Sequence, residues 1–212
     1  MGRTLYVTPE INRADEELKI NLNLPSKTEI KQAVKKLKTA KTSGPDNIPP
    51  EALKANSDLT ANILHKIYSD IWKNEVMPQD WNIGHLIKLP KKGNLKECKN
   101  YRGITLLSVV VKVINRILLT RLLKAVDEKL TEQQAGFGKD RSCTDQIAAL
   151  RIIIEQSLEW NSSLFLNFVD FEKAFHSLDR EVLWNLMAHY GLPQKFINII
   201  RNSYNNMQWS HT

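Results

Sequence analysis

A long apolar stripe in the middle of the chain constrains the fold more than any other feature of the sequence. Between Thr105 and Leu130, Leu106, Val109, Val113 and Ile117 recur at intervals of three and four, and Leu118 follows directly. This spacing places them on one face of an α-helix, and that face has to be covered by other elements. The segment therefore predicts a long core helix around which the rest of the chain packs.

Shorter patterns on either side predict further helices and a few strands. Ser26 and Glu29 have the spacing of a capping box, which indicates the start of a lysine-rich amphipathic helix. A turn is expected at Ser43-Gly44-Pro45-Asp46, with Gly44 supplying unusual backbone dihedral angles. Other helices are predicted at about Pro50–Trp72, from Thr144 through Leu158 and from about Asp179 to Tyr190, with Gly191 just past the end, and strands at Trp81–Leu89 and Leu164–Val169. Helices dominate, so the expected fold class is α+β.

The composition indicates which classes of partner the chain could bind. The 212 residues are 42% hydrophobic and carry a formal net charge of +7, which favours polyanions such as nucleic acid or anionic lipid. Cys98 and Cys143 lack Cys-x-x-Cys spacing, so we expect neither a zinc site nor a disulfide, but two buried or half-buried thiols. The N-terminus does not resemble a signal peptide, and no apolar run approaches the roughly 20 residues of a membrane span. The sequence predicts an intracellular protein with no membrane partner.

One carboxylate stands out. In Phe168-Val169-Asp170-Phe171 an apolar segment leads directly into Asp170. A strand end is rigid, and Mg²⁺ binds one or two protein carboxylates while leaving room for phosphate oxygens. Asp170 is therefore a candidate metal ligand. The alternative from these residues alone is that Asp170 begins a turn or caps a helix.

These residues also carry a family resemblance. FVDFEKAFHSLDR (168–180) resembles the first catalytic-aspartate motif of reverse transcriptases of non-long-terminal-repeat (LINE-type) retrotransposons. Three more blocks resemble that family in the same order: SGPDNIPPEALK (43–54), LPKKGNLKECKNYRGITLLS (89–108) and LTEQQAGFGKDRSCTDQIAAL (130–150). The resemblance implies a right-hand polymerase fold, with a poorly structured lead-in at 1–25, fingers at about 26–160 and the start of the palm at about 161–212.

The resemblance also implies an activity and a metal site. The activity is RNA-directed DNA polymerisation: transfer of a dNTP onto the 3′-hydroxyl of a DNA primer along an RNA template. Asp170 would be the first metal-binding aspartate, with the backbone carbonyl of Phe171 as a neighbouring ligand and Mg²⁺, or Mn²⁺ in its place, as the metal. Phe175 would lie under the incoming sugar, where its ring leaves little space for a 2′-hydroxyl.

Basic residues crowd a short stretch before the predicted core helix. The stretch contains one acid, Glu97, and six basic residues: Lys88, Lys91, Lys92, Lys96, Lys99 and Arg102. Such a stretch is a candidate phosphate-binding loop, because arginine grips phosphate with a rigid fork and lysine acts as a point charge. The alternative is a solvated basic loop. By resemblance, Arg102 would hold the triphosphate of the nucleotide with Lys91 as its companion, while Lys88 and Lys92 would contact nucleic acid.

The block at 133–145 is the expected template contact. The resemblance places Gln134, Gly136, Phe137 and Arg141 near the template strand. The two glycines that flank Phe137, Gly136 and Gly138, allow close approach of a partner. For Phe137 the alternative is a turn in which the ring plugs into the core.

The sequence departs from the family pattern at three points. His176 stands where the family has aspartate, and Gly103 where it often has proline. The sequence as given stops at Thr212, before the segments that carry the paired aspartates, and neither Glu172 nor Asp179 is expected to replace them, Asp179 being placed as a helix cap. We therefore expect these residues alone to be inactive as a polymerase, with a non-catalytic nucleic-acid-binding remnant as the alternative. The family implies a location in the nucleus or the cytoplasm.

Overall fold

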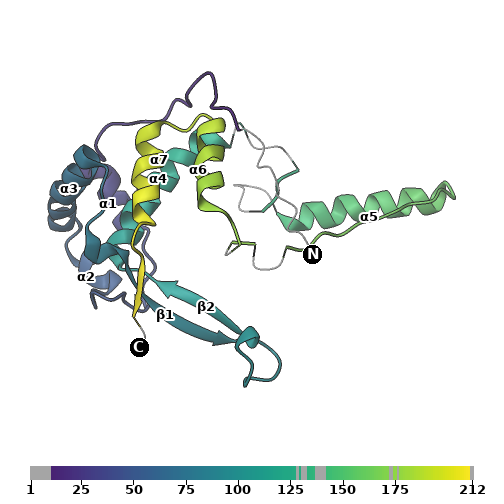
Figure 1. Cartoon of the computed structure of the whole chain (residues 1–212), viewed down its shortest axis with the longest axis horizontal. Helices are drawn as coiled ribbons and strands as arrows, with labels where there is room; N and C mark the ends of the chain where they lie inside the picture. The colour runs from purple at the N-terminus through teal and green to yellow at the C-terminus, as the bar shows by residue number, and fades with distance from the viewer. Residues whose placement is uncertain are drawn as a thin grey trace, which may run out of the picture.

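The computed structural model describes residues 11–127, 129, 133–136, 142–171, 174–175 and 177–210. Its elements confirm the α+β fold class (Figure 1). The helices are α1 Lys27–Lys35, α2 Pro50–Ala55, α3 Ser57–Asn74, α4 Val109–Val126, α5 Cys143–Glu159, α6 Arg180–His189 and α7 Gln194–Ser203. The strands are β1 Ile83–Pro90, β2 Tyr101–Leu106 and β3 Gln208–Ser210.

The core is built around α4, as the apolar stripe predicts. Val113 and Ile114 of α4 are fully buried, in one cluster with Ile30 of α1, Tyr68 of α3 and Phe196 of α7. Burying a large apolar side chain contributes about 1.5–3 kcal/mol, so this cluster is the main source of stability. The helix begins later than predicted because Thr105 belongs to β2. Ser108 then caps it by accepting a hydrogen bond from the amide of Val111.

Local capping sets most of the other helix ends. The predicted capping box at Ser26 and Glu29 is confirmed, with both reciprocal hydrogen bonds present. The predicted long second helix is instead two helices, because the Asn56 side chain accepts a hydrogen bond from the amide of Leu59 and starts α3 afresh. The predicted cap of α5 was also wrong: Ser142, rather than Thr144, caps that helix in a box with Asp145.

Two glycines are required for backbone reasons. A Cβ on Gly44 would lie 2.5 Å from the Cα of Ser108, and no positive φ is found there, so Gly44 serves close approach rather than the unusual dihedral angles expected. Gly191 has φ +83° just past α6, as predicted, and its carbonyl accepts a hydrogen bond from the amide of Leu18. Substitution at either position would disturb a packed backbone contact.

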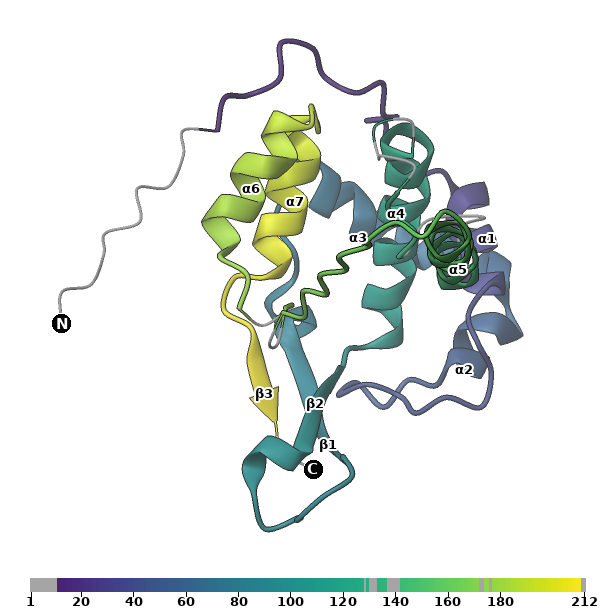
Figure 2. The ribbon, with the colours of Figure 1, turned by 90° about the vertical axis from the view of Figure 1, so that its right-hand side faces the viewer.

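The three strands form one sheet in the order β2-β1-β3. β1 confirms the predicted strand, and β2 pairs with it antiparallel from His85 opposite Leu106 to Pro90 opposite Tyr101. β3 joins the other edge of β1 in parallel. The β1–β2 hairpin extends out of the helical body with its connecting loop at the tip (Figures 1 and 2).

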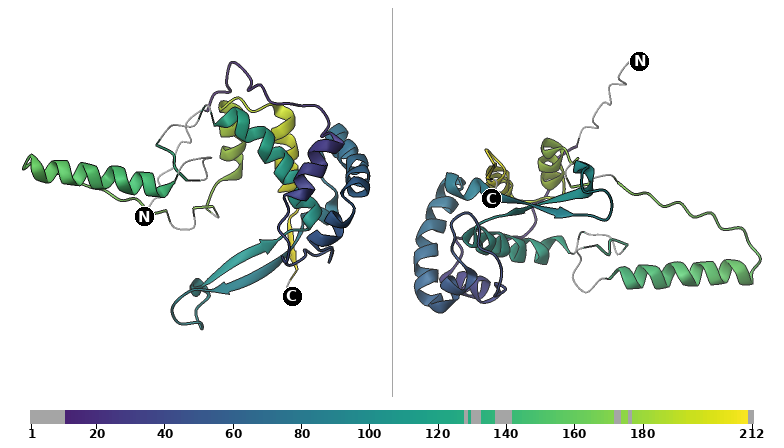
Figure 3. Two further views of the ribbon diagram at one scale, coloured as in Figure 1. Left: turned by 180° about the vertical axis from the view of Figure 1, so that it is seen from behind. Right: turned by 90° about the horizontal axis from the view of Figure 1, so that it is seen from below.

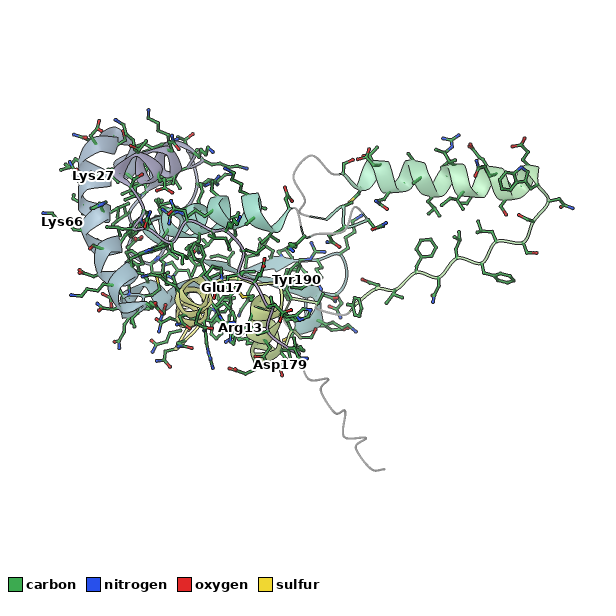
Figure 4. The ribbon with its side chains drawn as sticks, turned by 90° about the horizontal axis from the view of Figure 1, so that it is seen from above. Arg13, Glu17, Lys27, Lys66, Asp179 and Tyr190 are labelled. Atoms are coloured by element: carbon green, nitrogen blue, oxygen red, sulfur yellow. The ribbon has the colours of Figure 1, made fainter. Side chains whose placement is uncertain are left out.

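The N-terminal segment 11–25 has no helix or strand, but it is attached to the body. The amide of Ala14 donates to the carbonyl of Ala188, and the indole N–H of Trp72 donates to the carbonyl of Leu22. Figure 4 shows Arg13 and Glu17 over the region of Tyr190, at the end of α6. The segment thus links α6 to α3 and α4 across the top of the molecule (Figure 2).

The segment Leu164–Val169, predicted as a strand, is extended but forms no strand. No ladder joins it to any residue that the structure describes, and its side chains are exposed, Phe165 at 94% and Phe168 at 78%. α5 extends away from the body, and the chain then runs back along it towards the body (Figure 3). No described residue of α5 is buried. We call α5 and residues 160–171 the arm. A strand needs a partner for its backbone groups, and the three-stranded sheet lies elsewhere.

The two cysteines also differ from expectation. Cys98 and Cys143 are free and exposed rather than buried or half-buried. Cys98 lies in the hairpin loop and Cys143 at the first turn of α5, and neither position has apolar cover.

Candidate nucleotide and nucleic-acid site

The loop that joins β1 to β2 is held by its own hydrogen bonds. The amide of Lys91 donates to the carbonyl of Asn100 over 2.7 Å, directly beyond the last strand pair. Inside the loop the Asn100 side chain donates to the carbonyl of Asn94, and the Tyr101 hydroxyl donates to the carbonyl of Leu95. The basic loop therefore has a defined shape, unlike a freely solvated run of lysines.

The strand register fixes where two of the cations lie. Arg102 is opposite Leu89, and Lys88 is opposite Gly103. Since directly opposed residues share a face and successive residues alternate, Arg102 and Lys88 lie on opposite faces of the hairpin. A Cβ on Gly103 would come within 3.1 Å of Leu86, so the glycine in this position also fits the packing of the Lys88 face.

The hairpin presents net positive charge. The only acid in the loop, Glu97, pairs with Lys99, and the ammonium of Lys91 reaches the carbonyl of Lys99 at 3.3 Å. Among the described residues, Arg102, Lys88 and Lys92 are exposed and have no ion-pair partner. Exposed guanidinium and ammonium groups on a fixed backbone can bind phosphate oxygens without first breaking other contacts.

Asp170 lies at the end of the extended segment of the arm. Its side chain is exposed and has no hydrogen bond or ion pair in the part of the chain that the structure describes. The alternative that Asp170 caps a helix is not supported, since Asp179 caps the next helix, accepting from the amides of Glu181 and Val182 as predicted. Phe171 follows directly, and Phe175 is 81% exposed.

The described residues do not bring these two groups together. The arm and the hairpin leave the body in different directions (Figures 1 and 3), and no hydrogen bond or ion pair joins them within the described ranges. Of the expected template residues, Gln134 donates a hydrogen bond to the carbonyl of Gly136 at 3.2 Å, and both are exposed. Phe137, Arg141, Glu172 and His176 lie outside the described residues.

Sequence reasoning overlooked Arg121, a side chain of α4 that makes four hydrogen bonds. It donates to both carboxylate oxygens of Glu29 at 2.9 Å, to the carbonyl of Asn21 at 2.8 Å and to that of Asn23 at 2.7 Å. Its guanidinium also lies 5.3 Å from the centre of the Trp72 ring. The available signal was an arginine set among leucines in the core helix, Leu118-Leu119-Thr120-Arg121-Leu122-Leu123. Its hydrogen bonds lower the pKa of Glu29 below its ordinary value.

Comparison with known proteins identifies the family of the chain. The family model for "Reverse transcriptase (RNA-dependent DNA polymerase)" matches residues 89–212, from the end of β1 to beyond Asp170. The chain belongs to the reverse transcriptase family. The match covers the hairpin loop, β2, α4 and the arm, so Arg102 and Asp170 fall within the same family domain.

Relatives in retrotransposable elements confirm the resemblance to non-LTR reverse transcriptases. The chain is 26% identical over 161 residues to the Pol polyprotein of the type-2 retrotransposable element R2DM of Drosophila melanogaster, covering 76% of this chain and 15% of the relative. It is 27% identical over 207 residues to the probable RNA-directed DNA polymerase from transposon BS of the same species, covering 89% and 23%. It is 25% identical over 176 residues to the transposon TX1 149 kDa protein of Xenopus laevis, covering 83% and 14%. The chain thus spans less than a quarter of each of these relatives.

The two residues expected to hold a divalent metal can be tested for their fit to it. The carboxylate of Asp170 and the carbonyl of Phe171 are oxygen donors, which suit Mg²⁺. In the described ranges, no group of three or more histidine, cysteine, aspartate or glutamate residues could hold a metal ion. The donor chemistry of Asp170 suits Mg²⁺, but no described group of three or more such residues includes it. Among the helices described here, none is long and apolar enough to span a membrane.

Proposed function

We propose that this chain contributes nucleotide-binding and metal-binding groups to the RNA-directed DNA polymerase of a non-LTR retrotransposon. The observation that carries the proposal is the ordered hairpin, which exposes Arg102 and Lys92 with no ion-pair partner among the described residues. Both lie in the part of the chain that matches the reverse transcriptase family. A rigid, uncompensated basic element is what binding of a nucleotide triphosphate requires.

Each residue has a proposed role in nucleotidyl transfer. Arg102, with Lys91, binds the phosphates of the dNTP, and Phe175 lies under its sugar and excludes a 2′-hydroxyl. Asp170 and the carbonyl of Phe171 would hold Mg²⁺ or Mn²⁺, which when bound supplies positive charge to the reacting phosphate. The oxygen of the primer 3′-hydroxyl attacks the α-phosphorus and its proton passes to water. The phosphodiester bond forms as the bond from the α-phosphorus to the oxygen bridging the β-phosphate breaks, and pyrophosphate leaves with the charge that Arg102 balances.

The template has its own proposed contacts. Lys88 and Lys92 on the hairpin, and Gln134, Gly136, Phe137 and Arg141 in the block before α5, would hold the RNA template and the DNA primer. Because Lys88 and Arg102 lie on opposite faces of the hairpin, the nucleotide and the nucleic acid can bind on different sides of it.

The nucleotide role is tested by binding of a fluorescent dATP analogue to the chain and to Arg102→Ala. A charge-assisted hydrogen bond contributes about 1.5–3 kcal/mol, so the change should raise the Kd about tenfold or more. Lys38→Ala is the matched control, because Lys38 is also exposed and without an ion-pair partner in the described residues but lies outside the hairpin. Equal weakening by the two variants would show that only net charge matters, against the proposed role.

A second function, nucleic-acid binding without catalysis, is favoured by the uncompensated hairpin lysines. Backbone binding of this kind loses affinity steeply as the salt concentration rises. Filter binding of a template–primer duplex across a salt series tests this second function. An affinity that does not change with salt, or that is unchanged when Lys91, Lys92 and Arg102 are neutralised, would exclude it. Primer extension tests the expected inactivity of these residues alone, and dNTP incorporation that Asp170→Asn abolishes would contradict it. The two functions are separated by the dATP analogue, because only the first requires nucleotide binding that depends on Arg102.

A further inference from the structure

A preformed apolar pocket lies on the body, away from the basic hairpin loop. It has a volume of about 470 Å³ and lies between the 45–48 turn, α3, Trp81 and the first turn of α4. Its walls include Ile48, Ile63 and Ile67, and Ile63 is 52% exposed although it is a large apolar side chain. Pockets of this size and lining are typical of sites that take a bulky apolar group.

The walls are fixed by contacts that do not depend on an occupant. The turn packs on α4 through Gly44, whose missing Cβ leaves room for the backbone of Ser108. The Tyr68 ring meets the Trp81 ring edge-on with centres 6.2 Å apart, and the Tyr68 hydroxyl donates to the carbonyl of Val110. A pocket with fixed walls loses little conformational entropy when a ligand enters.

The polar lining of this pocket is acidic, although the chain is basic. Asp46 accepts a hydrogen bond from the amide of Ile48 in its own turn, and both Asp46 and Asp80 lack an ion-pair partner among the described residues. In a chain of net charge +7, two carboxylates without cations beside an apolar pocket form a local site of opposite sign. At physiological salt the Debye length is about 8 Å, so a small ligand in the pocket senses the two lining carboxylates more strongly than charges well beyond that distance.

We propose that this pocket is a docking site for a protein partner that inserts one bulky apolar side chain flanked by lysine or arginine. The isoleucines and Trp81 bury the apolar group, and Asp46 and Asp80 pair with the flanking cations. Nucleic acid does not fit, because its phosphates would face both carboxylates. The site is separate from Arg102 and Asp170, so it stands whether or not the proposed polymerase role holds.

The test uses two short peptides with the same apolar anchor and opposite charges, acetyl-Lys-Trp-Lys-amide and acetyl-Glu-Trp-Glu-amide. Binding is followed by the NMR shift of the Trp81 indole N–H, assigned with Trp81→Phe. The lysine peptide should bind about two- to tenfold more tightly than the glutamate peptide, which is the effect expected of two exposed ion pairs. Attraction by the net charge of the chain alone would give the opposite order.

Variants locate the interaction. Asp46→Asn with Asp80→Asn should abolish the preference, and asparagine at 46 keeps an acceptor for the amide of Ile48. Asp70→Asn is the control, because Asp70 is exposed on α3 and outside the pocket lining. Acetyl-Lys-Ala-Lys-amide should not bind. The proposal would be overturned by any of three results: no shift with either tryptophan peptide, tighter binding of the glutamate peptide, or an equal loss of preference in Asp70→Asn. Circular dichroism confirms that each variant is folded.

Discussion

Loss of the Arg121 side chain should strongly destabilise the body of the protein. Its side chain is only 6% exposed and joins α4 to Glu29 of α1 and to the carbonyls of Asn21 and Asn23 in the N-terminal segment. Arg121→Met keeps an apolar stem against Trp72 but removes every one of these hydrogen bonds. The change therefore isolates the polar contribution from the packing contribution.

The magnitude follows from the groups left behind. Removing one partner of a buried ion pair costs about 3–5 kcal/mol, but the Glu29 side chain is 33% exposed and water can replace part of the loss. Two backbone carbonyls also lose a charged donor. We expect the free energy of unfolding to fall by about 2–4 kcal/mol.

Urea unfolding at pH 7 measures this difference. With a slope of about 2 kcal/mol per molar urea, the midpoint should fall by about 1–2 M. Arg116→Met is the matched control, since Arg116 lies one and a half turns earlier on α4, is exposed and has no ion pair in the described part of the chain. If Arg121→Met shifts the midpoint no more than Arg116→Met, the cluster contributes no stability and the reasoning fails. Faster hydrogen exchange at the amides of Leu18 and Ile20 should accompany the loss, since the segment they belong to is tethered by Arg121.

Three further outcomes are expected. The pKa of Glu29 is lowered from 4.5, chiefly by the hydrogen bond from Arg121. The ionised Glu29 side chain therefore stabilises the fold above pH 4.5, and this stabilisation is lost as the pH falls through the folded pKa. Between pH 6 and 3, the urea midpoint should fall less steeply in Arg121→Met than in the unchanged chain. Gly44→Ala should cost about 1–3 kcal/mol of stability by overpacking against Ser108, whereas Gly136→Ala, where the nearest atom is 3.6 Å away, should be near neutral in the same assay. Asp179→Ala should cost about 1 kcal/mol by removing the cap of α6, and Asp179→Asn, which keeps an acceptor, should cost less in thermal unfolding.

The features that sequence predicted well are those with local causes. The Ser26–Glu29 capping box depends on four residues, and the buried stripe of α4 depends on helical periodicity alone. The same reasoning failed at Asn56, where a single side chain restarts the helix, because the sequence pattern on both sides reads as continuous. Gly44 was placed correctly in a turn, but its close contact with Ser108, 64 residues later in the chain, was invisible.

The features it missed depend on strand pairing. Tyr101–Leu106 forms β2 only because β1 is opposite it, and the sequence alone read its end as the beginning of a helix. This error mattered for the site, since the register decides that Arg102 and Lys88 face opposite sides. The sequence alone identifies the basic residues, but it does not show on which face of the hairpin each one lies.

The arm shows the converse case, a strand pattern without a strand. Leu164–Val169 has the apolar sequence of a buried strand, yet in the described structure its backbone groups meet no partner and Phe165 and Phe168 are exposed. An α-helix satisfies its backbone within the segment, so α5 forms without cover, while an extended segment cannot. The position of Asp170 follows from this difference. For the metal role proposed for Asp170, its carboxylate would have to be held within the tolerance that metal-assisted chemistry demands, and that requires a partner for the segment Leu164–Val169.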